Sequence, residues 1–399
     1  MGTTPNDASK LGTKMGDLRA QIGALAPELR ARLDRAGFDA ERLVTLAETL
    51  RAGGDAATRR DARNRVRGDV TAPTDDELRK IPEPGSAEEA RLRAIGEAAL
   101  AKGELAFCVM AGGMATRMGG VVKALVEAFD GKTFLDLRLA ENVAASAKAG
   151  RAVPLWLMTS DATDGPIREA LAKAKAPDHV ATFTQDLGLR LTASGDLFED
   201  DEGAPSTYAT GHGDLVDAVR RSGLLRKFRE RGGKVVWIAN LDNLGASIDP
   251  VILGLFLETK KDVMVEVCDK ANDRGGIPVH APSPRGERRL QVLEEFRLPV
   301  GFDAATVPVF NTNTFIVNAS ALEEAQIDWS WFEVEKKVGA KTAVQFERLL
   351  QEITSACDAA YVRVPRSGVR ARFLPVKDHD ELAKRRADIE AVARARHMI

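Results

Sequence analysis

The chain has 399 residues, a length that corresponds to two or three structural units. Charged residues make up 29% and hydrophobic residues 44%, and the formal net charge is -2, which is an ordinary globular composition. This balance gives no electrostatic basis for nucleic acid binding, and no apolar run approaches the roughly 20 residues of a membrane span. The composition therefore argues against a nucleic acid or a membrane as the partner.

The N-terminal stretch MGTTPNDASKLGTK is polar and lacks the apolar centre of a signal peptide. Residues 1–14 are therefore expected to form a disordered tail. The three cysteines, Cys108, Cys268 and Cys357, are far apart and lie in apolar sequence, which indicates reduced core thiols in a cytoplasmic protein. Five scattered histidines and no Cys/His cluster argue against a structural zinc site.

Residues 15–103 are predicted to form an N-terminal helical region. Leucine and isoleucine recur with helical spacing from Leu18 to Leu33, and the pattern resumes after Gly37. The stretch APTDDELRKIPEPGS predicts a linker with a short helical turn. Ser86 and Glu89 then have the spacing of a capping box, which predicts that a further helix starts there.

From residue 104 the pattern changes to short apolar runs that alternate with helical stretches. The runs are LAFCVMA, VPLWLMTS, KVVWIANLD, DVMVEVCD and VFNTNTFIVN. This alternation predicts an α/β core over residues 104–330 with a mixed, mostly parallel and buried sheet. Residues 331–399 are predicted to form a C-terminal segment with a lysine-containing stretch, a helix over 344–359 and a charged terminal helix.

The first apolar run ends in AGGMATRMGGVVK, which combines two glycine pairs with Arg117 and Lys123. Glycine lets the backbone approach a ligand and turn its N–H groups toward an anion, and the two cations add charge. The spacing excludes G-x-G-x-x-G, and Val126 occupies the place where a Walker loop before Gly131 and Lys132 needs glycine. The loop predicts a polyphosphate site, with a strand-to-helix turn that binds no ligand as the alternative.

This loop resembles the nucleotide-binding loop of sugar-nucleotide pyrophosphorylases, GG-x-GTR-x-G-x-x-x-PK. Further stretches agree with that family in order, namely LMTSDATDGPI, TFTQD, GHGD, ANLDNLGASID, VFNTNTFIVN, VQFE and VPRSGVRARFLPVK. GHGD is specific to the UTP–glucose-1-phosphate uridylyltransferase branch. The resemblance runs from about residue 104 to 380, and it implies a Rossmann-like nucleotidyltransferase core preceded by helices.

The sequence departs from the family pattern at three places. Ala115 replaces a glycine of the loop, and the stretch between Gly119 and Lys123 is one residue shorter and lacks the proline before the lysine. The sequence continues only briefly after FLPVK, so we expect no C-terminal β-helix domain of the kind that eukaryotic members carry. A monomer or a small oligomer is expected.

The resemblance implies the reaction of UTP with glucose 1-phosphate to give UDP-glucose and pyrophosphate, with Mg²⁺ as cofactor. The nucleophile is a phosphate monoester oxygen that is already ionised at pH 7, because its second pKa is about 6. The reaction therefore needs no general base, and it depends on placement and charge neutralisation.

The resemblance also implies a role for particular residues. Lys123 and Lys336 would contact phosphates, with the adjacent Lys337 as an alternative register, and Arg117 would hold pyrophosphate. Asp242, at the end of an apolar run, would bind Mg²⁺, which prefers carboxylate and phosphate oxygens. The implied nucleotide contacts are Gly112, Gly113, Met114, Gln185, Gly211 and His212. The implied sugar contacts are Asn240, Gly276, Glu294, Asn311 and Asn313.

Two other functions remain open at this stage. The chain could act on N-acetylglucosamine 1-phosphate or on several sugar 1-phosphates, although GHGD weighs against the former. It could instead be a catalytically weak regulatory protein that binds sugar nucleotides, an alternative that the altered loop keeps open. Retention of Lys123, Asp242 and Lys336 weighs against that alternative.

Overall fold

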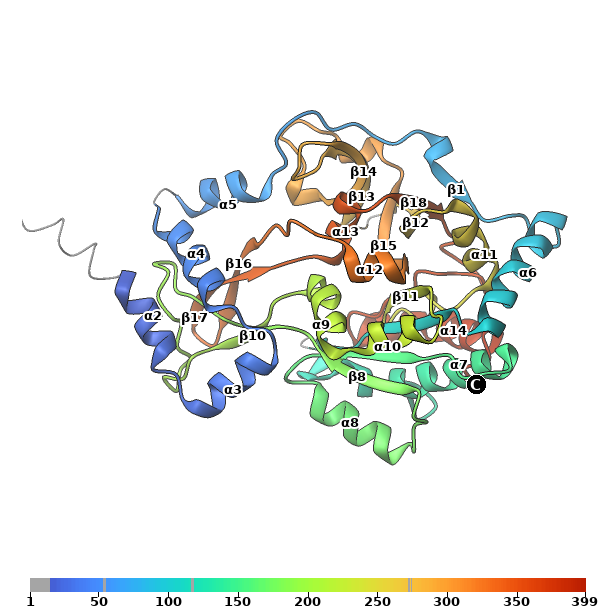
Figure 1. Ribbon diagram of the computed structural model, residues 1–399, viewed down its shortest axis with the longest axis horizontal. Coiled ribbons are helices and arrows are strands. Elements are labelled where there is room, and N and C mark those ends of the chain that lie inside the picture. Colours follow the sequence, from blue (N-terminus) through green and yellow to red (C-terminus); the bar gives the residue numbers. More distant parts are fainter. Residues whose placement is uncertain (1–14, 53–54, 116–117, 272, 274) are drawn as a thin grey trace, which may run out of the picture. The chain divides into compact units, whose positions relative to one another are not determined.

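The computed structural model describes residues 15–52, 55–115, 118–271, 273 and 275–399. The chain divides into two units, each built from separate segments (Figure 1). Unit 1 comprises Met1–Asn64, Gln185–Asp214 and Ser330–Leu349, and unit 2 comprises Arg65–Thr184, Leu215–Trp329 and Leu350–Ile399. These boundaries differ from the linear segments expected from the sequence, because two later segments belong to unit 1 together with the N-terminal helices.

The described part of unit 1 combines four α-helices and two antiparallel strand pairs. The helices are α2 Met15–Gly23, α3 Pro27–Arg35, α4 Ala40–Arg51 and α5 Ala56–Asn64, and the strand pairs are β9 Leu187–Leu189 with β10 Thr207–Ala209 and β16 Phe332–Val338 with β17 Lys341–Glu347. The leucine pattern expected near the N-terminus spans two helices, because Pro27 occupies the first turn of α3. Leu18 and Leu33 are buried in a core that also includes Val344 and Phe346 of β17.

The prediction of a helix over residues 344–359 is wrong. Residues 344–347 belong to β17, and the helical part is limited to the 3₁₀ helix η7, Leu350–Glu352, and α13, Ile353–Ala356. Ala359 then begins β18. Pairing with β16 decides this outcome, because it aligns Val344 and Phe346 on one buried face of a strand.

Unit 2 is built on one eight-stranded sheet in the order β1-β18-β12-β15-β11-β2-β7-β8. Its strands are β1 Leu78–Lys80, β2 Leu105–Met110, β7 Leu155–Thr159, β8 Val180–Thr184, β11 Val235–Asn240, β12 Val263–Asp269, β15 Val309–Asn318 and β18 Ala359–Arg363. Neighbouring strands are parallel except where β15 pairs with β11 and β12. The mixed, mostly parallel sheet expected from the apolar runs is confirmed, and all five runs form strands in it.

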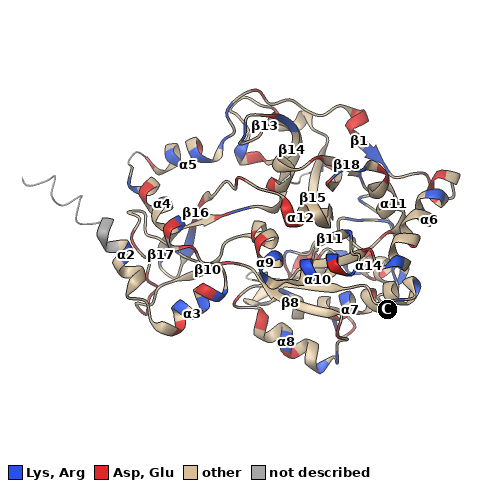
Figure 2. Ribbon diagram, in the orientation of Figure 1, with Lys and Arg blue, Asp and Glu red and all other residues tan. Residues whose placement is uncertain are grey.

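Helices and three small strand pairs surround the sheet of unit 2. The helices are α6 Ala87–Lys102, α7 Phe134–Ala149, α8 Asp164–Lys173, α9 Leu215–Ser222, α10 Leu224–Glu230, α11 Pro250–Thr259, α12 Ala319–Glu324, α13 and α14 His379–Ala395. The strand pairs are β3 Met114–Ala115 with β4 Val121–Val122, β5 Glu127–Phe129 with β6 Lys132–Thr133, and β13 Gly276–Pro282 with β14 Arg288–Glu294. Figure 2 shows charged residues on helices such as α6 and α10 and none on β11 or β15, as expected for strands buried on both faces.

The predicted start of α6 is confirmed, but only one of the two hydrogen bonds of the predicted capping box forms. Ser86 Oγ accepts a hydrogen bond from the Glu89 backbone N–H at 3.1 Å, whereas the Glu89 side chain accepts from Gly85 N–H instead of from Ser86. Upstream of this cap, the linker contains the expected helical turn, η1 Asp75–Glu77. It then adds β1, which was not expected and which pairs with β18 at one sheet edge.

The helices α6 and α11 lie side by side (Figure 1) because each carries a glycine at the contact. A Cβ on Gly96 would lie 1.9 Å from the Pro250 carbonyl oxygen, and one on Gly254 would lie 2.0 Å from that of Leu92. Asp249 caps α11 by accepting from Val251 N–H at 2.8 Å. This packing fixes the chain segment that follows β11.

All three cysteines are buried and none forms a disulfide, as expected. None of the helices that the structure describes combines the length and the apolar character needed to cross a membrane.

Candidate active site

The site in unit 2 starts from an ion pair between Lys123 and Asp242. Lys123 follows β4, and Asp242 follows β11. The Lys123 Nζ lies 2.7 Å from Asp242 Oδ2, and Val376 N–H donates to the same oxygen at 3.1 Å. The Lys123 and Asp242 side chains are 22% and 12% exposed, so the ion pair is mostly buried but can still be reached by solvent. Asp242 lies just past the carboxyl end of β11, which is parallel to β2, and open α/β sheets bind ligands at such strand ends.

The glycine-rich loop folds back as a hairpin that brings Lys123 to the end of β2. Met114 pairs with Val122 in β3 and β4, and Lys123 N–H donates to the Gly113 carbonyl at 3.2 Å. Gly120 closes the turn with φ +73°, a left-handed conformation that favours glycine. No atom lies within 4 Å of a Cβ placed on Gly113, so its backbone is open to a ligand.

Gly112 and Met114 flank Gly113 in this loop, and Met114 is 38% exposed. The backbone contacts expected of Gly112, Gly113 and Met114 therefore come from an accessible segment. Arg117, which was expected to hold pyrophosphate, lies outside the described residues.

Three asparagines converge on the same edge of the sheet. Asn313 Nδ2 donates to Asn240 Oδ1 at 3.1 Å, and Asn311 Oδ1 accepts from Asn313 N–H at 2.9 Å. Asn240 ends β11, two residues before Asp242. The asparagine cluster therefore continues along the backbone to the ion pair.

A bulge in β15 makes this convergence possible. Pairing with β12 shifts between Glu266 and Val267, so that two residues of β15 are left without partners in β12. Asn313 adopts φ +59°, a left-handed conformation that asparagine tolerates better than most residues. The Asn311 side chain supports it with a hydrogen bond two residues along the chain. The stretch NTN, residues 311–313, therefore both forms the bulge and supplies two of the asparagines of the site.

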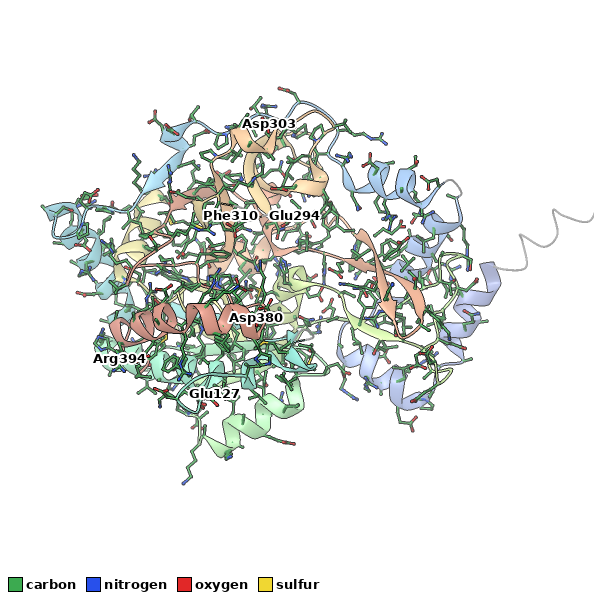
Figure 3. The ribbon with its side chains drawn as sticks, turned by 180° about the vertical axis from the view of Figure 1, so that it is seen from behind. Glu127, Glu294, Asp303, Phe310, Asp380 and Arg394 are labelled. Atoms are coloured by element: carbon green, nitrogen blue, oxygen red, sulfur yellow. The ribbon has the colours of Figure 1, made fainter. Side chains whose placement is uncertain are left out.

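Gly276 brings Glu294 next to the asparagines. These two residues are partners in the pairing of β13 with β14. A Cβ on Gly276 would lie 2.6 Å from Val292 Cγ1, 3.2 Å from Glu294 Oε1 and 3.7 Å from Asn311 Cβ. A side chain at position 276 would therefore displace the carboxylate of Glu294. Figure 3 labels Glu294 at the end of β14, in the same region as Phe310 of β15.

The Glu294 carboxyl has an unusual environment. Burial and the neighbouring charge of Glu295 raise its pKa to about 7, while Arg297 and a hydrogen bond from Gln351 act in the opposite direction. Gln351 Nε2 donates to Glu294 Oε1 at 2.5 Å. The sequence does not predict a role for Gln351, because the residue lies in no recognised motif.

In unit 1 the TFTQD and GHGD stretches, which contain Gln185, Gly211 and His212, are joined by Arg348, a residue that the sequence did not predict for the site. The Arg348 guanidinium binds Asp186 Oδ2 through Nη2 at 2.6 Å and Asp214 Oδ1 through Nε at 2.7 Å, and all three side chains are buried. Arg348 thereby joins the TFTQD and GHGD stretches. Removing one partner is expected to lower the stability of the fold strongly, because a buried charge would be left without a counter-charge.

The two glycines of GHGD allow the backbone of Arg348 to come close. A Cβ on Gly211, which has φ +102°, would lie 2.4 Å from the Arg348 carbonyl oxygen. Gly213 N–H donates to that oxygen at 3.0 Å, and Arg348 N–H donates to the Thr210 carbonyl at 2.9 Å. The motif therefore has a packing function in unit 1 in addition to any contact with a ligand.

Gln185 and His212 flank this buried charge cluster. Gln185 directly precedes Asp186 and is 8% exposed. Burial lowers the pKa of His212 to about 4, so the imidazole is neutral at pH 7. At neutral pH His212 can donate a hydrogen bond to a phosphate but cannot contribute a positive charge.

The two candidate lysines of β16 face opposite sides of their strand, because successive strand residues alternate. Lys337 shares a face with Glu333 and Glu335, which form ion pairs with Arg59 and Arg60 of α5. Lys336 shares the other face with Phe332 and Val334. Both lysines are exposed.

The expected residues thus form two groups, one in each unit. Unit 2 holds Gly112, Gly113, Met114, Lys123, Asn240, Asp242, Gly276, Glu294, Asn311 and Asn313, and unit 1 holds Gln185, Gly211, His212 and Lys336.

Asp242 was expected to bind Mg²⁺, and its surroundings would allow it to supply one of the ligands of the ion. Its Oδ2 atom carries both hydrogen bonds, and Oδ1 accepts none from the residues that the structure describes. Within the described ranges, no group of three or more His, Cys, Asp or Glu side chains could hold a metal ion. Mg²⁺ is commonly bound by one or two carboxylates together with substrate phosphates, so Asp242 suits that mode.

Comparison with solved structures defines the class of fold. The UDP-N-acetylglucosamine pyrophosphorylase of Trypanosoma brucei has a TM-score of 0.74 at 20% identity, with 98% of this chain and 85% of that chain covered. A UDP-glucose pyrophosphorylase mutant from Leishmania major has a TM-score of 0.64 at 23% identity, with 86% and 74% covered. The fold is therefore that of the nucleotide-sugar pyrophosphorylases.

The family itself is defined by sequence. Residues 66–397 match the family described as UTP–glucose-1-phosphate uridylyltransferase, and the chain belongs to this family. The protein of that name from Encephalitozoon cuniculi is 30% identical over 319 residues, which is 76% of this chain, and the one from Saccharomyces cerevisiae is 30% identical over 311 residues, or 72%. The match spans 60% of the length of each of these two relatives.

Proposed function

We propose that the chain catalyses Mg²⁺-dependent transfer of a uridylyl group from UTP to glucose 1-phosphate. The products are UDP-glucose and pyrophosphate, and the reaction is reversible. The observation that carries this proposal is a group of polar residues gathered in unit 2. Lys123 pairs with Asp242, and Asn240, two residues earlier in the chain, accepts from Asn313. Asn311 and Glu294 both lie close to Gly276. Family membership supports the same reaction.

The reaction joins a glucose 1-phosphate oxygen to the α-phosphorus of UTP and breaks the bond from that phosphorus to the bridging oxygen of pyrophosphate. The attacking oxygen is ionised at pH 7, so no side chain has to remove a proton. The main barrier is repulsion between two anions, together with the charge that develops on the leaving pyrophosphate. The residues needed are therefore cations, open backbone N–H groups and groups that orient the two substrates.

Lys123 supplies the positive charge at the reacting phosphates in this proposal. The open backbone at Gly113 lies next to it and donates to phosphate or to the base. Asp242 would hold Mg²⁺, which would supply positive charge to offset that of the phosphates. Lys336 is the proposed second phosphate contact, and its position on the strand face opposite Glu333 favours it over Lys337.

The polar cluster of unit 2 holds the hexose. Amide groups both donate and accept, and a carboxylate accepts strongly, which suits the many hydroxyl groups of a sugar. The Asn313 Oδ1 atom is buried and has no hydrogen-bond partner among the described residues, so a ligand hydroxyl would satisfy it. Gln185 is the proposed contact to the uracil edge, and His212 is proposed to donate to a phosphate or to the sugar.

The decisive experiment measures UTP-dependent release of pyrophosphate with a panel of sugar 1-phosphates. We expect release with glucose 1-phosphate and at least about tenfold lower kcat/KM with N-acetylglucosamine 1-phosphate, because a site built for hydroxyls leaves groups unpaired with the wrong sugar. Equal use of several sugars would instead indicate a broad UDP-sugar pyrophosphorylase. Binding of UDP-glucose without any pyrophosphate release would indicate a regulatory protein.

A further inference from the structure

We propose that Gln351 is a positioning residue that holds the Glu294 carboxylate in place for a hexose hydroxyl. The inference rests on the proposed function, because it assigns a sugar contact to Glu294. Gln351 lies in η7, a segment that follows unit 1 in the chain and belongs to unit 2. It is 2% exposed, so it supports the site from beneath and does not line it.

The orientation of the Gln351 amide follows from its partner. In its charged form Glu294 only accepts hydrogen bonds, and the Gln351 amide nitrogen donates to Glu294 Oε1 at 2.5 Å. This bond occupies one oxygen of Glu294. The other oxygen, Oε2, accepts no hydrogen bond from the described residues, so a ligand hydroxyl can donate to it. Gln351 therefore fixes the carboxylate through one oxygen and leaves the other free.

The backbone of Gln351 is itself anchored to β14. Thr354 Oγ1 donates to the Gln351 carbonyl at 2.6 Å and accepts from Val292 N–H at 2.9 Å. Val292 is two residues before Glu294 on that strand. The Thr354 hydroxyl therefore links the backbone of Gln351 to the strand that carries Glu294. A side chain on a rigid, hydrogen-bonded support places a functional group more reproducibly than one on a free loop.

The surrounding charges show why this donor matters. Glu295 forms an ion pair with Lys270 at 3.0 Å, and Arg297 forms one with Glu352 at 3.2 Å. Both nearby cations are thus already paired with other carboxylates. Burial raises the pKa of Glu294 to about 7, and the Gln351 hydrogen bond favours the charged form against that effect. Loss of the donor should raise the pKa of Glu294 further and leave more of it protonated at pH 7.

The test compares UDP with UDP-glucose, because the difference between them isolates the hexose contribution. We would titrate both ligands by calorimetry into the full-length protein and into Gln351→Leu between pH 5.5 and 8.5. We expect UDP affinity to be unchanged and UDP-glucose affinity to fall about tenfold at pH 7, the effect of losing one hydrogen bond to a charged group. The pH below which UDP-glucose binding weakens should move upward in the variant.

Gln291→Leu is the matched control. Gln291 lies on the same strand as Glu294, is also 2% exposed and donates to the Ala281 carbonyl at 2.9 Å. It loses a buried amide without touching the carboxylate, so the preference for UDP-glucose over UDP should persist. A second variant, Glu294→Gln, removes the charge. Adding Gln351→Leu in that background should cause less than a twofold further loss, because the positioned group is absent.

The outcomes separate the two proposals. If the parent protein binds neither UDP nor UDP-glucose, the proposed function is wrong and the positioning role falls with it. If the parent prefers UDP-glucose and Gln351→Leu keeps both that preference and its pH dependence, the positioning role alone is overturned. An equal loss in Gln291→Leu would also overturn it, because the effect would then be structural.

Should Gln351→Leu fail to fold, Gln351→Glu replaces it with nearly the same volume. Its second carboxylate should likewise shift UDP-glucose binding to higher pH, and an unshifted profile would contradict the role.

Discussion

Lys123 and Asp242 are 119 residues apart in the chain, yet the lysine Nζ lies 2.7 Å from Oδ2 of the carboxylate. The contact joins the glycine-rich loop after β2 to the segment after β11. Without ligand each charge thus neutralises the other. Both have further roles in the proposed reaction, so bound phosphates and Mg²⁺ would compete for the same two groups.

Lys123→Ala should lower kcat by at least about 100-fold, because it removes a positive charge that acts on the transition state. The fold should persist, since the pair is partly exposed. Steady-state kinetics together with a thermal melt would test this. Turnover close to that of the parent would rule out the catalytic role of Lys123.

Asp242→Asn should raise the Mg²⁺ concentration needed for half-maximal rate and lower the maximal rate, because a neutral amide binds the ion less well than a carboxylate. Rates measured across a magnesium titration give both quantities. Glu295→Gln provides a control, since Glu295 is an acidic residue paired with Lys270. Identical metal dependence in Asp242→Asn and the parent would contradict the assignment.

Gln185→Ala should weaken UTP binding relative to glucose 1-phosphate by about tenfold, because an unpaired base edge costs ~1–3 kcal/mol. Separate KM values for the two substrates distinguish this result from general damage to the protein. A raised KM for glucose 1-phosphate with an unchanged KM for UTP would assign Gln185 to the sugar half of the reaction.

His212 should make stability depend on pH in the acidic range. Its folded pKa is about 4, against 6.5 for an ordinary histidine, so the unfolded chain takes up a proton that the folded one refuses. This contribution to stability is complete above about pH 6.5 and is lost as the pH falls toward 4. Urea midpoints measured from pH 4.5 to 7.5 should therefore fall less steeply with acid in His212→Gln than in the parent. Parallel curves would show that the imidazole does not titrate in this way.

Glu294→Ala should raise the KM for glucose 1-phosphate more than the KM for UTP, whereas Glu295→Ala should affect neither by more than about twofold. The two side chains differ in partner, because Glu294 binds Gln351 and Glu295 binds Lys270. A loss in charge-assisted hydrogen bonding of about 1.5–3 kcal/mol corresponds to roughly tenfold or more in KM. The reverse pattern would move the sugar contact to Glu295.

Local patterns were sufficient for the elements that depend on local physics. The apolar runs predicted the five central strands, because a strand buried on both faces must be apolar throughout. The cap at Ser86 was predictable for the same kind of reason, since its partner lies three residues away. The expected helix over residues 344–359 failed because β16, outside that segment, turns its first residues into a strand.

The candidate site divides in the same way. The sequence by itself determined the residue types, namely the glycine loop with Lys123, the carboxylate of Asp242 and the asparagines of β15, and with them the family. Only the tertiary structure decided which of these residues meet. It placed Asn240 against Asn313 through a bulge, set Glu294 against Gly276 and brought in Gln351 and Arg348, which no motif had marked. The physical reason is that hydrogen bonds and ion pairs act over a few ångströms in space, whereas a sequence records only separation along the chain.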